Sequence, residues 1–444
     1  MIEVVDTACK FSVAVIDAMA EVQMFTTANS SIIAELSHCF AEKIMNKYNN
    51  FSEIHLVFDT YVDESLKGSE RVRREKGTVP VRYIIDQNTR IQNIPMKKLL
   101  SHTHTKNDLT ECFSKAVISV ARQRSRNVTV SFRNEAMSTE LDTTDLVSSH
   151  EEADTKLMLH AVNATQRGAE CIRIFSSDTD VLVLAVRRAS VLADDTNIVT
   201  LGRNVRRINV AKIYEKLGSI RAAALPGLHA ISGADVTGSF NGKAKTSFWK
   251  AFMVAPVNVL RALTALGKTE HIDDDTFNGL EQFICSIYAQ TRHRVSCHNL
   301  ADLRWSFFSK KQSQADKTPP TLSALRPATR RCHYQCMEWE RDTEPHPKLP
   351  PASDYGWIFE NGKYDPVMCE IQCAPEEVLH LIRCACTKGR CVPPCKCASQ
   401  IPRLTCSEMC ECGGDTECCD NTESAEDTVD DDDASEDDSD TECF

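Results

Sequence analysis

The sequence predicts an α/β fold in which a parallel sheet is flanked by helices, followed by a small cysteine-rich module. Three apolar runs rich in β-branched residues indicate buried strands at residues 11–16, 53–58 and 172–177. Apolar residues at helical spacing indicate helices at residues 31–47 and 152–164. Strands that alternate with helices in this way are typical of parallel sheets whose helices cover both faces.

The rest of the chain divides into one long helical stretch and several other segments. Residues 210–265 read as mainly helical, with breaks at glycines. Residues 64–76 are polar and basic, and we expect a loop or a helix there. We expect irregular structure in four further segments: 101–110, 134–149, 312–330 and 341–353.

The net charge of −12 is concentrated at one end of the chain. Residues 422–444 hold 12 of the 63 acidic residues and no Lys or Arg, so the other 51 acidic residues match the 51 basic ones. Such a segment cannot bury apolar area, and we expect a disordered acidic tail. There is no apolar run of eighteen residues and no signal-peptide pattern, so we expect no membrane association. A reducing compartment, nucleus or cytoplasm, is the default, with the nucleus favoured.

Carboxylates stand directly after the predicted strands and in short acidic patches elsewhere. In parallel sheets, function collects at the carboxyl ends of the strands. Hydrolysis of a phosphodiester can use two Mg²⁺ or Mn²⁺ ions about 4 Å apart, held by several carboxylates. Seven residues are therefore candidate catalytic metal ligands: Asp17, Asp59, Glu152, Asp154, Asp178, Asp180 and Asp235. Glu151 is an alternative to Glu152, because the two acids are adjacent.

The order and surroundings of these acids resemble the flap-endonuclease/XPG family of nucleases. The matching motifs are residues 11–17 (FSVAVID), 55–59 (HLVFD), 152–154 (EAD), 176–180 (SSDTD) and 228–235 (LHAISGAD). They occur in the family's order over roughly residues 11–260. The resemblance implies a PIN-like fold and a structure-sensitive, two-metal nuclease acting on DNA or RNA, with DNA favoured.

Two basic segments are candidate nucleic-acid contacts. Residues 238–245 (GSFNGKAK) resemble the family's helix-two-turn-helix loop, and the segment after the second strand matches the placement of its phosphate-contacting residues. The candidate residues are Lys67, Arg71, Arg73, Arg74, Gly238, Gly242, Lys243 and Lys245. The alternatives are a solvated charged face for the first segment and an ordinary surface turn for the second.

The cysteines cluster in the last quarter of the sequence, where 15 of the 21 lie between Cys332 and Cys443. Without a secretory signal, closely spaced cysteines indicate metal rather than disulfides. Nine thiolates cannot form three separate four-thiolate sites, so sulfurs that bridge several Zn²⁺ ions are implied. The candidate ligands are Cys384, Cys386, Cys391, Cys395, Cys397, Cys406, Cys410, Cys412 and Cys419, with Cys418 as an alternative to Cys419.

This spacing resembles a single CXC module of the tesmin/TSO1 type, a family that binds DNA. A further four cysteines, in two CxxxC pairs, could form another zinc site, although core or incidental positions are favoured for them: Cys332, Cys336, Cys369 and Cys373.

We expect four parts in the chain: a nuclease domain (1–265), a helical and irregular extension (266–375), the zinc module (376–421) and the acidic tail (422–444). The alternative to an enzyme is a nucleic-acid-binding or scaffold protein that uses the same fold without cleaving. The oligomeric state stays open.

Overall fold

The computed structural model describes residues 9–27, 30–74, 80–202, 204–289, 299–309 and 318–371, together with most of the clustered cysteines and a few neighbours between 384 and 421. The chain divides into two compact units, Met1–Met368 and Cys369–Phe444. The acidic tail 422–444, Cys373, Cys418 and the side chain of Arg74 lie outside the described residues.

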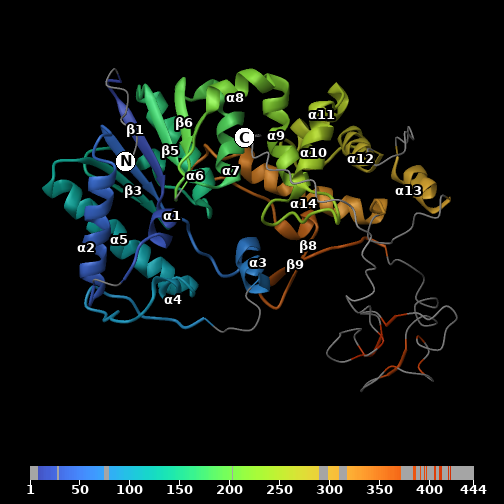
Figure 1. The fold of residues 1–444 in the computed structure, drawn as a ribbon, viewed down its shortest axis with the longest axis horizontal. Coiled ribbons are helices and arrows are strands. Elements are labelled where there is room, and N and C mark those ends of the chain that lie inside the picture. The colour runs from blue at the N-terminus through green and yellow to red at the C-terminus, as the bar shows by residue number, and fades with distance from the viewer. Residues whose placement is uncertain are drawn as a thin grey trace. The chain divides into compact units, whose positions relative to one another are not determined.

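A seven-stranded sheet lies in the first unit, in the order β4-β3-β2-β1-β5-β6-β7 (Figure 1). The five central strands are parallel and the two edge strands pair antiparallel to their neighbours. This confirms the predicted class, a mainly parallel sheet flanked by helices. The strands are β1 (Ser12–Asp17), β2 (Glu53–Val57), β3 (Asn127–Phe132), β4 (Glu135–Ser138), β5 (Cys171–Phe175), β6 (Asp195–Val199) and β7 (Arg207–Asn209).

Each face of the sheet has its own apolar core, because side chains alternate along a strand. Val13 and Val15 of β1 face one core, while Ala14 and Ile16 face the other, and all four are fully buried. This explains why β1 reads as a continuous apolar run.

Helices cover both faces. The second core contains residues of α1 (Ala18–Gln23), α2 (Ile33–Lys47) and α5 (Thr103–Gln123). The first core contains residues of the helices α6 (Ala153–Gln166), α7 (Thr179–Arg187), α8 (Val210–Leu217), α9 (Ser219–Gly233), α10 (Lys245–Met253), α11 (Val257–Ala265), α12 (Asp274–Ala289), α13 (Leu300–Ser309) and α14 (Leu322–Glu340). The short helices α3 (Leu66–Arg74) and α4 (Met96–Leu99) complete the set, and a hairpin follows, β8 (Trp357–Glu360) and β9 (Lys363–Pro366).

Three segments that we expected to be irregular contain strand or α-helix, and one of them, 134–149, contains β4. Within 101–110, α5 begins at Thr103, where the side chain of His102 accepts a hydrogen bond from the backbone N–H of His104. Within 312–330, α14 begins at Leu322, capped by Thr321, and continues through Pro327 because its face is buried. Local caps and tertiary burial outweigh the proline signal there.

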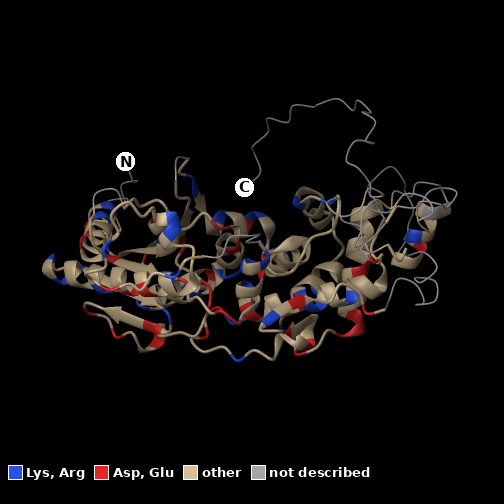
Figure 2. Cartoon of the chain, turned by 90° about the horizontal axis from the view of Figure 1, so that it is seen from below, with Lys and Arg blue, Asp and Glu red and all other residues tan. Residues whose placement is uncertain are grey.

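Acidic and basic residues are interspersed along the described elements (Figure 2). Among the described residues, no helix is both long and apolar enough to cross a bilayer.

Candidate active site

Three aspartates meet at the carboxyl ends of neighbouring central strands. Asp17 ends β1, Asp59 follows β2 by two residues, and Asp178 follows β5 by three. β2 and β5 lie on opposite sides of β1, and helices that follow them pack on opposite faces of the sheet, α5 in one core and α7 in the other. Such a switch point is where parallel sheets form a crevice. Asp17 and Asp178 also cap α1 and α7, since their side chains accept the N–H groups of Ala20 and Asp180 at 3.1 and 2.9 Å.

The start of α6 carries three more carboxylates to the same place. The side chain of Asp59 accepts the N–H of Ala153 at 2.8 Å, and this bond fixes the helix start beside β2. Glu152 and Asp154 are buried there, while Glu151 accepts a hydrogen bond from the Ser65 hydroxyl at 2.8 Å. Both acids of the adjacent pair therefore face this region, and the choice between them stays open.

Asp180 lies in the first turn of α7 and has a partner of its own. Nε2 of His229, in α9, lies 2.6 Å from Oδ1 of Asp180. Carboxylate oxygens of Asp154, Asp178 and Asp180 all lie within 4.8 Å of one another, a spacing that can hold a metal ion.

These elements enclose an open cleft of about 490 Å³ within the first unit. Six of the seven predicted carboxylates line this cleft, and the seventh, Asp180, donates its backbone N–H to the side chain of Asp178. The acidic residues that line it are Asp17, Asp59, Glu70, Glu151, Glu152, Asp154, Asp178 and Asp235.

Lys67 of α3 is a cation that lines the cleft and contacts two of its acids. Its Nζ lies 2.7 Å from Glu152 and 3.3 Å from Asp235. Burial lowers the pKa of Lys67, but the charges of Glu152 and Asp154 raise it overall. Lys67 thus stays charged and joins the half-exposed Asp235, beyond the end of α9, to the buried acids of α6.

Negative charge exceeds positive charge in this cleft, and the pKa shifts of its acids reflect that excess. Burial and the charge of Asp59 raise the pKa of Asp17 to about 7. Burial raises the pKa of Glu152 and of Asp154 well above the usual range, and the charge of Asp178 adds to the shift at Asp154. Burial also raises the pKa of Asp178. Bound cations would relieve this mutual repulsion.

The predicted basic residues divide between two places. Lys67 and Arg71 line the acidic cleft. Arg73 instead donates hydrogen bonds to the backbone oxygen of Tyr364 at 3.0 Å and to Asp365 at 3.3 Å, in the hairpin. Gly238, Lys243 and Lys245 line a second, neighbouring cavity. Gly242, in the same loop between α9 and α10, has φ of +66°, and Gly238 has +74°, backbone angles that favour glycine.

Sequence reasoning missed several residues of the site. Lys106 of α5 lines the cleft, with its Nζ 4.9 Å from the ring of Tyr61. Glu338, in α14, interacts electrostatically with Lys67 and Glu151, and burial raises its pKa to about 7. His229 belongs to the motif 228–235, but the sequence analysis predicted no role for it. None of these residues follows a strand, so no local pattern singles them out.

In the second unit, the nine described cysteines from Cys384 to Cys419 gather in one cluster. Cys369 lies outside this cluster, and its thiol donates to the backbone oxygen of Ile371 at 2.9 Å. Four sets of four sulfurs each have all their atoms within 4.8 Å, and Cys384 belongs to three of these sets. All nine predicted ligands occur in them. Asn421 supports the cluster, because its backbone oxygen accepts the N–H of Cys406 at 2.6 Å and its side-chain amide donates to the Cys406 sulfur at 3.3 Å. Cys332 and Cys336 lie instead in the core of the first unit, as favoured.

No family model matches this chain, and no curated protein matches it. Among solved structures, it is similar to a pseudo-enzyme–product complex of the bacteriophage T5 D15 flap endonuclease with DNA and metal ions, at 10% identity and a TM-score of 0.35, over 74% of this chain and 90% of that one. It is also similar to a mutant of the T5 5′-exonuclease, at 10% identity and a TM-score of 0.32, over 63% and 85%. A third similar structure is the T5 D15 protein co-crystallized with metal ions, at 11% identity and a TM-score of 0.34, over 63% and 94%. These identities and TM-scores are too low to assign a function to this chain.

Proposed function

We propose that this chain is a divalent-metal-dependent phosphodiesterase that cleaves nucleic acid in a structure-sensitive way, DNA in preference to RNA. The observation that carries the proposal is the meeting of carboxylates from β1, β2, α6 and β5 in one cleft. Single surface acids are common, but here acids from four separate elements converge, and two of them, Glu152 and Asp154, are buried. Bound cations would relieve the repulsion between these carboxylates.

The donor set fits Mg²⁺ or Mn²⁺. Both ions prefer carboxylate oxygen, and oxygens of the cleft residues Asp154 and Asp178 and of the adjacent Asp180 lie within 4.8 Å of one another. Asp17 and Asp59 would complete the ligands of a two-ion site, with Glu152 and Asp235 acting directly or through water. When bound, such ions neutralise charge on the phosphate and lower the pKa of bound water.

The basic side chains of the cleft wall would bind and orient the phosphodiester. Lys67, held by Glu152 and Asp235, keeps a positive charge beside the carboxylates. Arg71 lies 3.5 Å from Glu151, with its guanidinium 5.0 Å from the ring of Tyr61. Both cations can stabilise charge that builds up on the phosphate in the transition state. His229 would hold the Asp180 carboxylate in one orientation.

The direct test uses purified full-length chain with end-labelled flap, hairpin, duplex and single-stranded substrates, each with Mg²⁺, Mn²⁺ or EDTA. We expect metal-dependent cleavage with a preference for one junction, and none in EDTA. Binding without cleavage in every metal would instead assign the fold to nucleic-acid binding. Cleavage that survives EDTA would refute the metal-dependent mechanism.

We also propose that the second unit is a multi-zinc module of CXC type that contacts DNA. The sharing of Cys384 and Cys406 among several four-sulfur sets supports bridging thiolates. Binding of the substrates above by the full-length chain and by its Cys384→Ser variant tests this proposal. Equal affinities would remove DNA contact from this module and favour the alternative, a contact with protein.

A further inference from the structure

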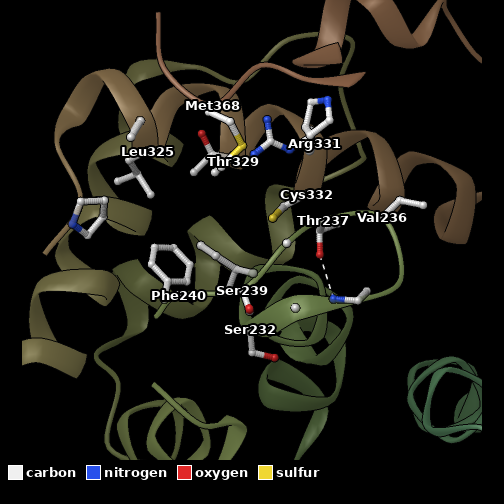
Figure 3. A pocket seen from close by; sticks show the side chains of 18 of the residues that line it. Ser232, Val236, Thr237, Ser239, Phe240, Leu325, Thr329, Arg331, Cys332 and Met368 are labelled. Carbon is white, nitrogen blue, oxygen red and sulfur yellow. Dashed lines mark hydrogen bonds between the residues drawn. The ribbon is translucent and has the colours of Figure 1, made fainter. Parts of the chain in front are cut away.

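Tyr61 is a residue of the acidic cleft that lies outside the motifs found in the sequence. It stands two residues after Asp59, and 9% of it is exposed. It lines the cleft and not the neighbouring cavity, whose wall contains Phe240, Leu325 and Cys332 (Figure 3). Any ligand that Tyr61 affects directly is therefore a ligand of the cleft.

The hydroxyl group of Tyr61 donates a hydrogen bond to Oδ2 of Asp59 at 3.0 Å. The other oxygen of that carboxylate, Oδ1, accepts the backbone N–H of Ala153 at 2.8 Å. The carboxylate is therefore held at both oxygens, and its plane cannot rotate freely. Each oxygen has two lone pairs, so each keeps one that can bind a metal ion.

The backbone around Tyr61 is fixed on both sides. The N–H of Thr60 donates to the backbone oxygen of Glu151 at 2.7 Å, and the Thr60 hydroxyl accepts a hydrogen bond from Nζ of the buried Lys156 at 2.6 Å. The side chain of Asn107, in α5, donates to the backbone oxygen of Tyr61 at 2.9 Å and accepts its N–H at 3.3 Å. The hydroxyl group of Tyr61 therefore reaches Asp59 from a fixed base.

Two cationic side chains lie over the ring of Tyr61. The guanidinium of Arg71, in α3, lies 5.0 Å from the ring centroid, and Nζ of Lys106, in α5, lies 4.9 Å from it. Cations within about 6 Å of an aromatic ring are attracted to its face. Both cations also line the cleft, so one ring holds basic groups from two separate helices there.

We propose that Tyr61 is a positioning residue of the acidic cleft, which sets the directions of one metal ligand and of two phosphate-binding cations. Its hydroxyl group fixes the plane of the Asp59 carboxylate. Its ring keeps Arg71 and Lys106 in the cleft, where both can bind phosphate oxygens. The inference rests on the proposed nuclease function and adds Lys106 to its phosphate-binding residues.

Two substitutions separate the hydroxyl group from the ring. Tyr61→Phe removes only the hydroxyl group, and Tyr61→Leu removes the ring as well. The same two changes at Tyr214, a partly buried tyrosine of α8 that lies outside the cleft, are the matched controls. Thermal unfolding of the four full-length variants establishes that they fold.

Metal binding is measured first, from the electron paramagnetic resonance signal of free Mn²⁺. Each full-length protein is titrated after its thiols have been loaded with Zn²⁺, and the Mn²⁺ that Asp180→Asn fails to bind is assigned to the cleft. We expect both Tyr61 variants to raise the Kd for this Mn²⁺ by about 10-fold to 100-fold, the usual effect of losing a hydrogen bond to a metal ligand. The Tyr214 variants should bind it as the wild type does.

Nucleic-acid binding is measured next, with a fluorescent DNA hairpin in saturating Ca²⁺. Tyr61→Phe keeps the ring and should bind this hairpin with the affinity of the wild type. Tyr61→Leu loses two contacts between a cation and the ring, and its Kd should rise about 5-fold or more. This difference separates positioning from a general loss of structure, which would change both affinities in both variants.

Both measurements are independent of cleavage, so they separate this proposal from the nuclease function. Wild-type Mn²⁺ affinity in Tyr61→Phe would overturn the role of the hydroxyl group, and wild-type hairpin affinity in Tyr61→Leu would overturn the role of the ring, even in an active nuclease. The expected shifts in a chain that cuts no substrate would support the positioning role and refute only the nuclease. A wild type that binds no Mn²⁺ would refute both.

Discussion

Asp180 differs from the neighbouring carboxylates in having a histidine partner. Although burial raises the pKa of Asp180, the hydrogen bond and charge of His229 lower it overall. Burial instead raises the pKa of Asp154 and Asp178, which have no comparable cationic contact in the described part of the chain. Asp180 therefore stays ionised beside two acids that share a metal-binding geometry with it.

We expect Asp180→Asn to lower kcat for cleavage by about 100-fold or more, because a lost charged ligand weakens transition-state stabilisation by several kcal/mol. Asp145→Asn, which changes an exposed aspartate, is the matched control. Cleavage is measured with saturating Mg²⁺ and nucleic-acid binding in Ca²⁺. Turnover equal to that of the wild type would remove Asp180 from the site.

A buried histidine pair gives the fold a pH dependence. Nδ1 of His55 lies 2.7 Å from Nδ1 of His160, and the Ser131 hydroxyl lies 2.7 Å from the other nitrogen of His160. Burial lowers the pKa of both histidines, and Glu53 only partly opposes this at His55. An unfolded histidine titrates near pH 6.5, so below that pH the unfolded chain binds more protons than the folded one. Stability is therefore present above pH 6.5 and falls as the pH is lowered.

The loss can reach about 1.4 kcal/mol per pH unit for each histidine. We expect the fall in Tm between pH 7 and pH 5 to be smaller in His160→Gln than in the wild type. His38→Gln, at an exposed histidine, should keep the wild-type fall. Equal falls in all three proteins would show that other groups cause the acid sensitivity.

The contact between helices α9 and α11 depends on one glycine. A Cβ at Gly227 would lie 2.2 Å from the backbone oxygen of Leu263. Alanine is favoured over glycine in helices by about 1 kcal/mol, but overpacking costs about 1–3 kcal/mol, and a backbone oxygen cannot rotate away. We expect Gly227→Ala to lower the free energy of unfolding in urea, with Ser219→Ala in the same helix nearly neutral. A gain in stability would mean that α11 moves aside freely.

Elements that are determined by their own residues could be predicted from the sequence, and elements that are determined by contacts with distant residues could not. The strands β1, β2 and β5 were predictable because buried parallel strands need continuous apolar runs. The starts of α5 and α14 were not, because a histidine cap and packing around Pro327 decide them. The carboxylates at strand ends could be found from their position. Lys106 reaches the cleft only through tertiary packing, and tertiary packing also brings Glu338 within electrostatic reach of Lys67.

At the scale of the whole molecule, the two compact units are stabilised by different means. Residues 1–368 contain two large apolar cores, while the described core of residues 369–444 consists of cysteines. The expected boundary at residue 265 lies inside the first unit. We propose that metal ions bound to these thiols offset the chain entropy of the second unit.

We therefore expect more than one zinc ion per full-length chain by elemental analysis. Cys384→Ser should lower the zinc content by more than one ion, because this residue belongs to three four-sulfur sets, whereas Cys39→Ser, outside the cluster, should not change it. A strong chelator should remove the zinc without changing the main unfolding transition of residues 1–368. Zinc-free protein with paired disulfides would contradict the metal assignment.

The helix α3 connects the two cavities of the first unit. Lys67 binds the acids of the cleft, while Ser69 accepts the N–H of Tyr364 at 2.9 Å and Arg73 holds the same hairpin residue through its carbonyl (Figure 1). A ligand in either cavity would therefore contact this one helix. Thermodynamic linkage then sets a reciprocal relation. The factor by which a ligand in the second cavity changes the affinity of the cleft for metal equals the factor by which the metal changes the affinity for that ligand.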